Sequence, residues 1–420
     1  MAANSVVAGV LVARLLGAES LGAYLVLTVA VQSLIHVSGF SLHIANTYFT
    51  ARDVNKLPVA GVNSVLFGII SGGVCTAILL LFSRSALPGV PFELAIVGLA
   101  AVPFQIVTIY FLNLFLAHRE IGRFNFIDLA NQSFVLLNAV VALVLIGGGL
   151  SLLVSLNTLA AIAMALISGA MLYRFASVKV AGASWKPDLS LLREMLAYSA
   201  KGYLLWMSML LLYRVDLLVV NYFKGAAEAA VYAVATQCTL FLLLLPQAIS
   251  QLLQAKVAAD RDEGGEFTCR VSRVTTVLMF AACIASIPGA YLVAFIYGPG
   301  FERLPHLLWI LLPGVLFVGV QQVVAQYFLG TGLPLKAALT WLAALLTNIL
   351  ANILVVPTHG APGAAVVSTL CYIAVSIVMF AFFTKTTGRR ITELIIPDPS
   401  DLRKFWLTIR KDRDASVITK

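Results

Sequence analysis

The sequence predicts an all-α integral membrane protein with about twelve transmembrane helices, arranged as two parallel repeats of six helices. Of its 420 residues, 60% are hydrophobic and only 11% are charged, whereas soluble domains carry about 45–50% apolar and about 25% charged residues. The apolar residues occur in long runs, and the second half of the chain repeats short motifs of the first half. A chain with so much apolar surface needs lipid rather than water around it.

Twelve apolar runs are separated by charged residues or by Gly and Pro. Each run is a candidate to cross about 30 Å of hydrocarbon as a helix. The first run is short, which indicates either a misplaced start or the loss of half a helix. The predicted helices are 2–16, 21–49, 59–82, 92–117, 125–147, 150–173, 194–221, 228–254, 271–297, 304–330, 335–356 and 362–384.

Short loops on one side of the predicted bundle carry most of the basic residues. Loops after the even-numbered helices, together with the C-terminal tail, hold 22 of the 28 Lys and Arg residues, whereas the opposite side holds four. Cytoplasmic loops carry this excess in membrane proteins. We therefore expect both termini in the cytoplasm. The net charge of +9 then reflects topology and contact with anionic lipid, not binding to nucleic acid.

Several classes of protein are disfavoured by what the sequence lacks. It contains no GxxxxGK[ST] motif, so we expect no nucleotide-driven motor in this chain. Its five cysteines are scattered without a CxxC pair, so we predict no disulfide, no metal site and no cofactor. A membrane glycosyltransferase or ligase would need acidic catalytic residues and a large extracytoplasmic loop, whereas the loops on that side are short. We therefore predict a non-enzymatic protein with no catalytic residues.

The two halves of the chain share motifs in consistent register. Matching pairs are Gly17–Gly225 and Tyr24–Tyr232 at an offset of 208, and Pro103–Pro313, Gly122–Gly332 and Asn138–Asn348 at an offset of 210. An offset of six helices gives parallel repeats, and in transporters of this build the substrate path lies between two rocking lobes. A non-transporting membrane scaffold is the alternative. The predicted parts are an N-terminal lobe 1–173, a cytoplasmic linker 174–193, a C-terminal lobe 194–384 and a basic cytoplasmic tail 385–420.

Motifs in both halves resemble those of the polysaccharide-biosynthesis flippases. These are the O-antigen and exopolysaccharide translocases of the multidrug/oligosaccharidyl-lipid/polysaccharide (MOP) superfamily. Ala18 stands where that family often has Pro, and the start of the first helix is missing. The similar segments are Ala13–Gly17 with Leu21–Tyr24, Tyr213–Asp216, Tyr222–Gly225, Tyr232–Ala235, Tyr297–Phe301, Phe328–Gly332 and Gly360–Ala365.

The resemblance implies a multi-pass protein of a bacterial or archaeal inner or plasma membrane. Such a protein moves a polyprenyl-diphosphate-linked oligosaccharide from the cytoplasmic to the outer leaflet by alternating access, for synthesis of cell-surface polysaccharide. Its partners would be the lipid-linked glycan, the bilayer and a polysaccharide polymerase or glycosyltransferase. The family's cavity is lined by helices 1, 2, 7 and 8. The alternative within the superfamily is an ion-coupled exporter of drugs or small cations, which should contain buried carboxylates.

A polar stripe is predicted on one face of the second helix, with a related stripe on the eighth. Either stripe could line a hydrated path or form hydrogen bonds between helices, and the sequence leaves both interpretations open. The first stripe contains Gln32, His36, Gly39, His43, Thr47 and Thr50, with Asn46 beside it, and the second contains Gln247, Gln251 and Gln254.

Charged residues inside predicted helices are candidates for the site, because such charges are costly in lipid and usually face protein or water. Arg214 and Lys201 could bind a diphosphate, although Lys201 could instead extend to the cytoplasmic interface. Further substrate-binding candidates are Arg14, Arg52, Gln251 and Gln254. Candidates for coupling to a proton or sodium gradient are His36, His43 and Asp216, of which Asp216 could instead be a structural partner.

Overall fold

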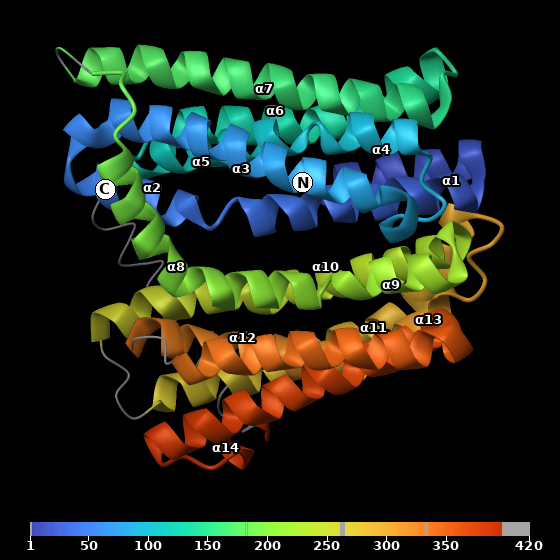
Figure 1. Cartoon of the computed structure of the whole chain (residues 1–420). Coiled ribbons are helices and arrows are strands. Elements are labelled where there is room, and N and C mark those ends of the chain that lie inside the picture. The colour runs from blue at the N-terminus through green and yellow to red at the C-terminus, as the bar shows by residue number, and fades with distance from the viewer. Residues whose placement is uncertain (1, 181, 183, 261–264, 332–334, 397–420) are drawn as a thin grey trace, which may run out of the picture. The chain divides into compact units, whose positions relative to one another are not determined.

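The computed structural model describes residues 2–180, 182, 184–260, 265–331 and 335–396 (Figure 1). Every regular element in this part of the chain is helical, as the sequence predicts. The chain forms two compact units: unit 1 contains Met1–Ala233 and Ile296–Phe301, and unit 2 contains Val234–Phe295 and Glu302–Lys420. The predicted lobes 1–173 and 194–384 are the two six-helix halves of the sequence, whereas these units are defined by contacts between residues. The boundaries of the lobes therefore stay a prediction.

The helices of the first half begin and end close to the predicted positions, with several breaks inside them. They are α1 Ala2–Ser38, α2 Leu42–Arg52, a 3₁₀ turn Val54–Lys56, α3 Leu57–Ala86, α4 Phe92–Leu99, α5 Val102–Ala117, α6 Ile121–Ala139, a π-helical turn Val140–Leu145 and α7 Gly149–Lys179. The remaining helices are α8 Leu189–Leu212, α9 Val215–Lys224, α10 Ala226–Asp260, α11 Glu266–Tyr297, α12 Leu304–Thr331, α13 Leu335–Thr387 and α14 Thr392–Ile395.

Nine stretches of the described chain are long and apolar enough to cross a membrane. Large apolar side chains project from them into the surroundings: Leu81 of α3 is 81% exposed and Leu354 of α13 is 77% exposed. Apolar surface of this kind is stable in lipid and not in water. The chain is therefore an all-helical, multi-pass membrane protein.

Helix α13 contains two of the predicted helices, joined by a reversal at Gly360. Gly360 has non-helical backbone angles (φ 59°, ψ −147°). The Nδ2 of Asn348 donates to Oγ of Ser368 over 3.4 Å, although residues 20 apart in a straight helix are about 30 Å apart. The chain therefore folds back at Gly360, so this one stretch supplies both predicted helices, 335–356 and 362–384.

Helix α1 folds back in the same way, at Gly17. A Cβ built on Gly9 would lie 3.9 Å from the side chain of Leu21, whereas residues 12 apart in a straight helix are about 18 Å apart. Gly17 has φ 84° and ψ 172°, and its repeat partner Gly225 has φ 82° and ψ 174°. Only glycine adopts this conformation without strain, which explains why the repeat keeps glycine at both positions.

Hydrogen bonds extend the internal repeat beyond the motifs found in the sequence. Asn138 donates to Oδ1 of Asn157, as its partner Asn348 donates to Ser368. Thr158 in unit 1 donates to the carbonyl of Val97, over 2.9 Å. Thr369 in unit 2, 211 residues later, donates to the carbonyl of Ile310 over 2.7 Å. Each half therefore fixes its last helix with the same two kinds of contact.

The predicted linker 174–193 is largely helical, since α7 continues to Lys179 and α8 begins at Leu189. Asp188 caps α8 by accepting from the backbone N–H groups of Ser190 and Leu191. Asn63 of α3 binds the backbone of Asp188 twice, donating to its carbonyl over 2.8 Å and accepting from its N–H over 3.1 Å. These bonds fix the connection against α3.

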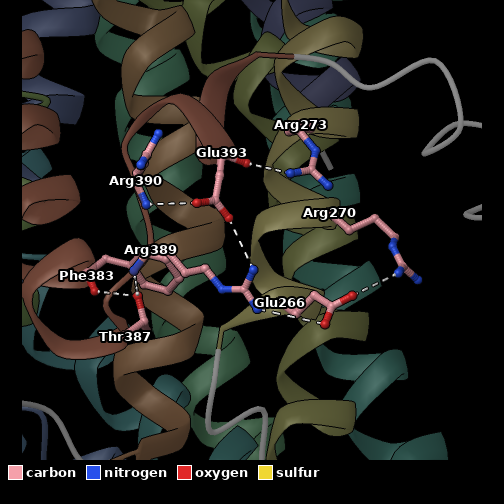
Figure 2. Close-up of polar contacts among 8 residues, drawn as sticks. All are labelled: Glu266, Arg270, Arg273, Phe383, Thr387, Arg389, Arg390 and Glu393. Carbon is pink, nitrogen blue, oxygen red and sulfur yellow. Dashed lines mark hydrogen bonds and ion pairs between the residues drawn. The ribbon is translucent and has the colours of Figure 1, made fainter.

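A cluster of charged side chains at the start of α11 holds the chain that follows α13 (Figure 2). Ser272 and Arg273 donate to the backbone carbonyls of Leu394 and Glu393. Arg389 lies between two carboxylates, 3.2 Å from Glu393 and 3.8 Å from Glu266. Hydrogen bonds from the Arg390 backbone N–H and the Arg389 side chain lower the pKa of Glu393. Residues 397–420 of the predicted basic tail lie outside the described chain.

Candidate functional site

The second predicted helix, 21–49, is not continuous, because the chain breaks between α1 and α2. Phe40 and Ser41 have positive φ angles of 45° and 51°, which bulky L-residues rarely adopt. The break divides the predicted polar stripe, leaving Gln32 and His36 on α1 and the remaining members on α2. The single helix face expected from the sequence is therefore wrong.

Hydroxyl groups from two neighbouring helices donate to backbone carbonyls at the break, two of which also accept a backbone N–H from α2. Tyr203 of α8 donates to the carbonyl of Val37, and Tyr110 of α5 donates to that of Gly39, each over 2.6 Å. Ser199 of α8 donates to the carbonyl of Ser41 over 3.2 Å. Non-helical backbone at membrane depth needs such partners, because lipid supplies none. The break is therefore a fixed feature of unit 1.

We expect Tyr110→Phe to lower the stability of the protein by about 0.5–1.5 kcal/mol, because the Gly39 carbonyl loses one of its two donors and keeps only the backbone N–H of Leu42. Tyr110 itself is 1% exposed, so water cannot replace its hydroxyl. Thermal unfolding of the purified protein in detergent measures the effect. Tyr173→Phe is the control, because the Tyr173 side chain is 56% exposed on α7. Equal unfolding temperatures for the two variants would show that the hydroxyl of Tyr110 does not support the break.

The seventh predicted helix, 194–221, is also broken, at Tyr213 and Arg214. Helix α8 ends at Leu212 and α9 begins at Val215, with Arg214 as its N-cap residue. Arg214 is half-buried. The strongest sequence candidate for anion binding therefore lies at the start of a short helix, where the dipole also favours negative charge.

Charged groups from the two breaks lie within electrostatic reach of each other. The positive charge of Arg214 acts on His36, and His36 interacts in turn with His43. His36 is exposed on α1, and His43 is half-buried at the start of α2. The structure thus brings together three of the residues that the sequence nominated.

Asp216 belongs to a different, buried cluster. It is 1% exposed, and its Oδ2 accepts from the hydroxyl of Tyr232 over 2.5 Å. Its Oδ1 accepts from the backbone N–H of Leu217 over 2.8 Å. These contacts match the structural role that the sequence left open for Asp216, since they hold α9 against the first turns of α10.

The lower part of the polar stripe forms hydrogen bonds between helices. Asn46 is fully buried and donates to Oγ of Ser64 on α3 over 2.9 Å. Thr47 donates to the carbonyl of Asn113 on α5, over 3.4 Å. Thr50 is buried and donates to the carbonyl of Asn46 in its own helix. Asn46 thus bonds between helices, whereas Thr50 bonds within α2 and Thr47 also donates to the carbonyl of His43 in α2 over 3.1 Å. Both interpretations of the stripe stay predictions.

The remaining sequence candidates lie elsewhere. Arg14 donates from Nε to the carbonyl of Ile296 over 2.7 Å, so this N–H group is not available to a substrate. Arg52 lies at the C-terminal end of α2, beyond the break. Lys201, Gln251 and Gln254 lie within α8 and α10, but their side chains are outside the described part of the structure.

Sequence reasoning missed the three hydroxyls of Tyr110, Ser199 and Tyr203. The signal for the break itself was present, because Ser38-Gly39-Phe40-Ser41 interrupts an apolar run with small residues. Nothing in the local sequence of α5 or α8 shows that their hydroxyls reach α1. Such partners come from tertiary packing alone.

Two discontinuous helices with a guanidinium and two imidazoles form an arrangement suited to an anion. Half-helices that begin inside a membrane direct positive dipole ends at anionic groups in transporters. Arg supplies paired donors that match phosphate oxygens, and His can add a further donor. The site has the chemistry of anion recognition.

Several solved structures of membrane transporters are similar to this chain over most of its length. A multidrug resistance MATE family transporter of the MOP superfamily, in an inward-facing conformation, matches with a TM-score of 0.75 at 16% identity, over 94% of this chain and 95% of that one. The lipid II flippase MurJ matches with a TM-score of 0.73 at 14% identity, over 94% and 87%. The chain has the MOP transporter fold.

A third MOP-fold structure, a MOP superfamily transporter from Pyrococcus furiosus with a binding pocket of reversed polarity, matches with a TM-score of 0.59 at 16% identity, over 92% of this chain and 91% of that one. No protein-family model and no curated protein sequence matches the chain. These likenesses establish the fold alone.

Proposed function

We propose that this protein is a flippase that moves a polyprenyl-diphosphate-linked oligosaccharide from the cytoplasmic to the outer leaflet, for synthesis of cell-surface polysaccharide. The observation that carries the proposal is the half-buried guanidinium of Arg214, which stands at the N-cap of α9 where the seventh predicted helix is broken. A diphosphate is the anionic part of such a substrate. Transport by alternating access between two lobes is the mode that parallel repeats support.

The fold supports this proposal without selecting the substrate. MurJ, which shares the MOP fold with this chain, is a lipid II flippase, so the fold accommodates movement of a lipid-linked substrate. The motifs from Ala13 to Tyr24 and from Tyr213 to Ala235 favour the polysaccharide branch. The basic loops favour a cytoplasmic orientation for both termini, in an inner or plasma membrane.

An experiment in a deletion strain tests the proposal. We expect diphosphate-linked oligosaccharide to accumulate on the cytoplasmic leaflet, as assigned by a membrane-impermeant probe, and wild-type protein to relieve the accumulation. Arg214→Ala should lower the rate of translocation about 10–100-fold, because hydrogen bonds to a charged group contribute about 1.5–3 kcal/mol. Arg303→Ala removes an exposed arginine outside the site and should behave as wild type.

Normal leaflet distribution of the glycan lipid in the deletion strain would overturn the flippase proposal. If Arg214→Ala and Arg303→Ala lower the rate of translocation equally, the flippase proposal stands but Arg214 does not bind the substrate. Both proteins must be present at equal levels in the membrane, which immunoblotting of the membrane fraction establishes.

The second candidate is an ion-coupled exporter of drugs or small cations, and one residue favours it. Asp128 is half-buried in α6, inside the candidate span Ile121–Leu145, and has no hydrogen bond or ion pair within the described chain. A carboxylate in that state could bind a cation or a proton. Normal glycan lipids together with raised sensitivity to cationic drugs in the deletion strain would make this the working function.

A further inference from the structure

A cluster of aromatic and basic side chains lies where α2 ends beside α8. Tyr48 of α2 stacks on Tyr198 of α8, with ring centroids 4.3 Å apart and planes inclined by 21°. Phe49 meets Tyr198 edge-on at 5.9 Å. We call Tyr48, Phe49, Arg52, Lys56 and Tyr198 the mouth cluster. It belongs entirely to unit 1 and differs from the site at the helix breaks.

Both cations of the mouth cluster are held over aromatic rings. The guanidinium carbon of Arg52 lies 4.1 Å from the centroid of Tyr48, and Nζ of Lys56 lies 5.5 Å from that of Phe49. Because Tyr198 covers one face of Tyr48, the guanidinium occupies the other. Stacking of this kind fixes a guanidinium while leaving its N–H groups directed outward from its edge.

No carboxylate in the described chain pairs with these cations. The neighbouring Asp53 accepts a hydrogen bond from the backbone N–H of Asn55 over 3.0 Å. Glu194 lies one helical turn before Tyr198 on α8, yet it forms no ion pair with Arg52 or Lys56. Arg52 is exposed and Lys56 is half-buried. Two ordered cations without acidic partners therefore present their donors to whatever approaches this end of α2.

The position of the mouth cluster relates it to the Arg214 site. Helix α8 continues from Tyr198 to Leu212, two residues before Arg214, which corresponds to about 21 Å along α8, most of the thickness of the hydrocarbon. The distribution of basic residues assigns the loop after α2 to the cytoplasmic side. A substrate made in the cytoplasm would reach the mouth cluster first.

We infer that the mouth cluster is the cytoplasmic docking site for the diphosphate of the lipid-linked substrate, with Arg52 as its main ligand. This inference rests on the proposed function for the identity of the substrate. Arg52 supplies paired donors to one phosphate, and Lys56 supplies a point charge to the other. Tyr48 and Tyr198 position the guanidinium and make no contact with the phosphate.

Binding of geranylgeranyl diphosphate to the purified full chain in detergent tests the docking site, with calorimetry as the measurement. We expect Arg52→Ala to weaken binding about 10-fold, and Tyr48→Leu about 3-fold, because the guanidinium loses its support. Tyr48→Phe keeps the ring and should bind as wild type. Arg84→Ala is the matched control, since Arg84 is also exposed and lies 5.5 Å over Phe92, at the opposite end of α3.

The outcomes separate this inference from the proposed function. If wild type binds the diphosphate and Arg52→Ala binds it as tightly as Arg84→Ala, the docking site is wrong and the flippase proposal stands. If phosphatidylglycerol competes as well as the diphosphate, the cluster is a general lipid headgroup site and the inference is overturned. If wild type binds neither geranylgeranyl diphosphate nor inorganic pyrophosphate, the docking site is overturned, and the leaflet assay in the deletion strain decides the flippase proposal separately.

Discussion

Replacing Gly22 with alanine should destabilise unit 1 by about 1–3 kcal/mol or more, because α1 and the start of α10 approach each other there without room for a methyl group. A Cβ at Gly22 would lie 1.8 Å from the carbonyl oxygen of Ala226 and 2.4 Å from its carbonyl carbon. These are backbone atoms, so the helices themselves must shift. Thermal unfolding of the purified protein in detergent measures the loss.

Gly73→Ala is the matched control for this prediction. Gly73 lies inside α3, and a Cβ built there has no neighbour within 4 Å. Alanine in a helix interior is about 0.5–1 kcal/mol more favourable than glycine, so Gly73→Ala should be neutral or slightly stabilising. An unfolding temperature for Gly22→Ala equal to that of Gly73→Ala would contradict the close approach of α1 to Ala226.

Asp216→Ala should cost about 2–5 kcal/mol of stability, because two buried donors lose their acceptor together. These are the hydroxyl of Tyr232 and the backbone N–H of Leu217. Tyr232 is fully buried, so water does not reach its hydroxyl. Chemical denaturation in mixed micelles would give the difference in free energy of unfolding.

Two further variants separate the Asp216 carboxylate from general helix effects. Tyr232→Phe removes the hydroxyl together with its hydrogen bond to Asp216, so no buried donor is left without an acceptor. This variant should lower the stability less than Asp216→Ala does. Glu93→Ala removes an exposed carboxylate from the first turn of α4, a comparable helix position, and should change little. Equal effects of Asp216→Ala and Glu93→Ala would show that the carboxylate does not hold α9 to α10.

The helical class and the positions of most helices could be predicted because lipid imposes long apolar runs, which are visible in the sequence. The internal repeat was visible in the sequence as well. Its paired glycines, Gly17 and Gly225, have matching backbone angles, and α1 reverses direction at Gly17. The breaks at Phe40 and Arg214 were not predicted. The small residues Ser38-Gly39-Phe40-Ser41 mark the first break only weakly, and the hydroxyls that bind its carbonyls come from α5 and α8.

The candidate site was only partly predictable for the same reason. Arg214, His36 and His43 stood out because charged or titratable groups are costly inside a span. Their mutual proximity depends on how α1, α2, α8 and α9 pack. Arg52 was nominated only by its position at a helix mouth, and its stacking on Tyr48 became visible in the structure. Tyr198, which completes that stack, carries no distinguishing signal in the sequence.

A translocation assay in proteoliposomes is the most direct test of the proposed flippase activity. Purified protein would be reconstituted with a fluorescent polyprenyl-diphosphate oligosaccharide in one leaflet, and a lectin added outside would report its appearance in the other leaflet. We expect wild type to move the glycan lipid, Arg214→Ala to do so about 10–100-fold more slowly, and Arg303→Ala to match wild type. Failure of wild type to move the glycan lipid, with active transport of a cationic dye by the same preparation, would contradict the flippase proposal.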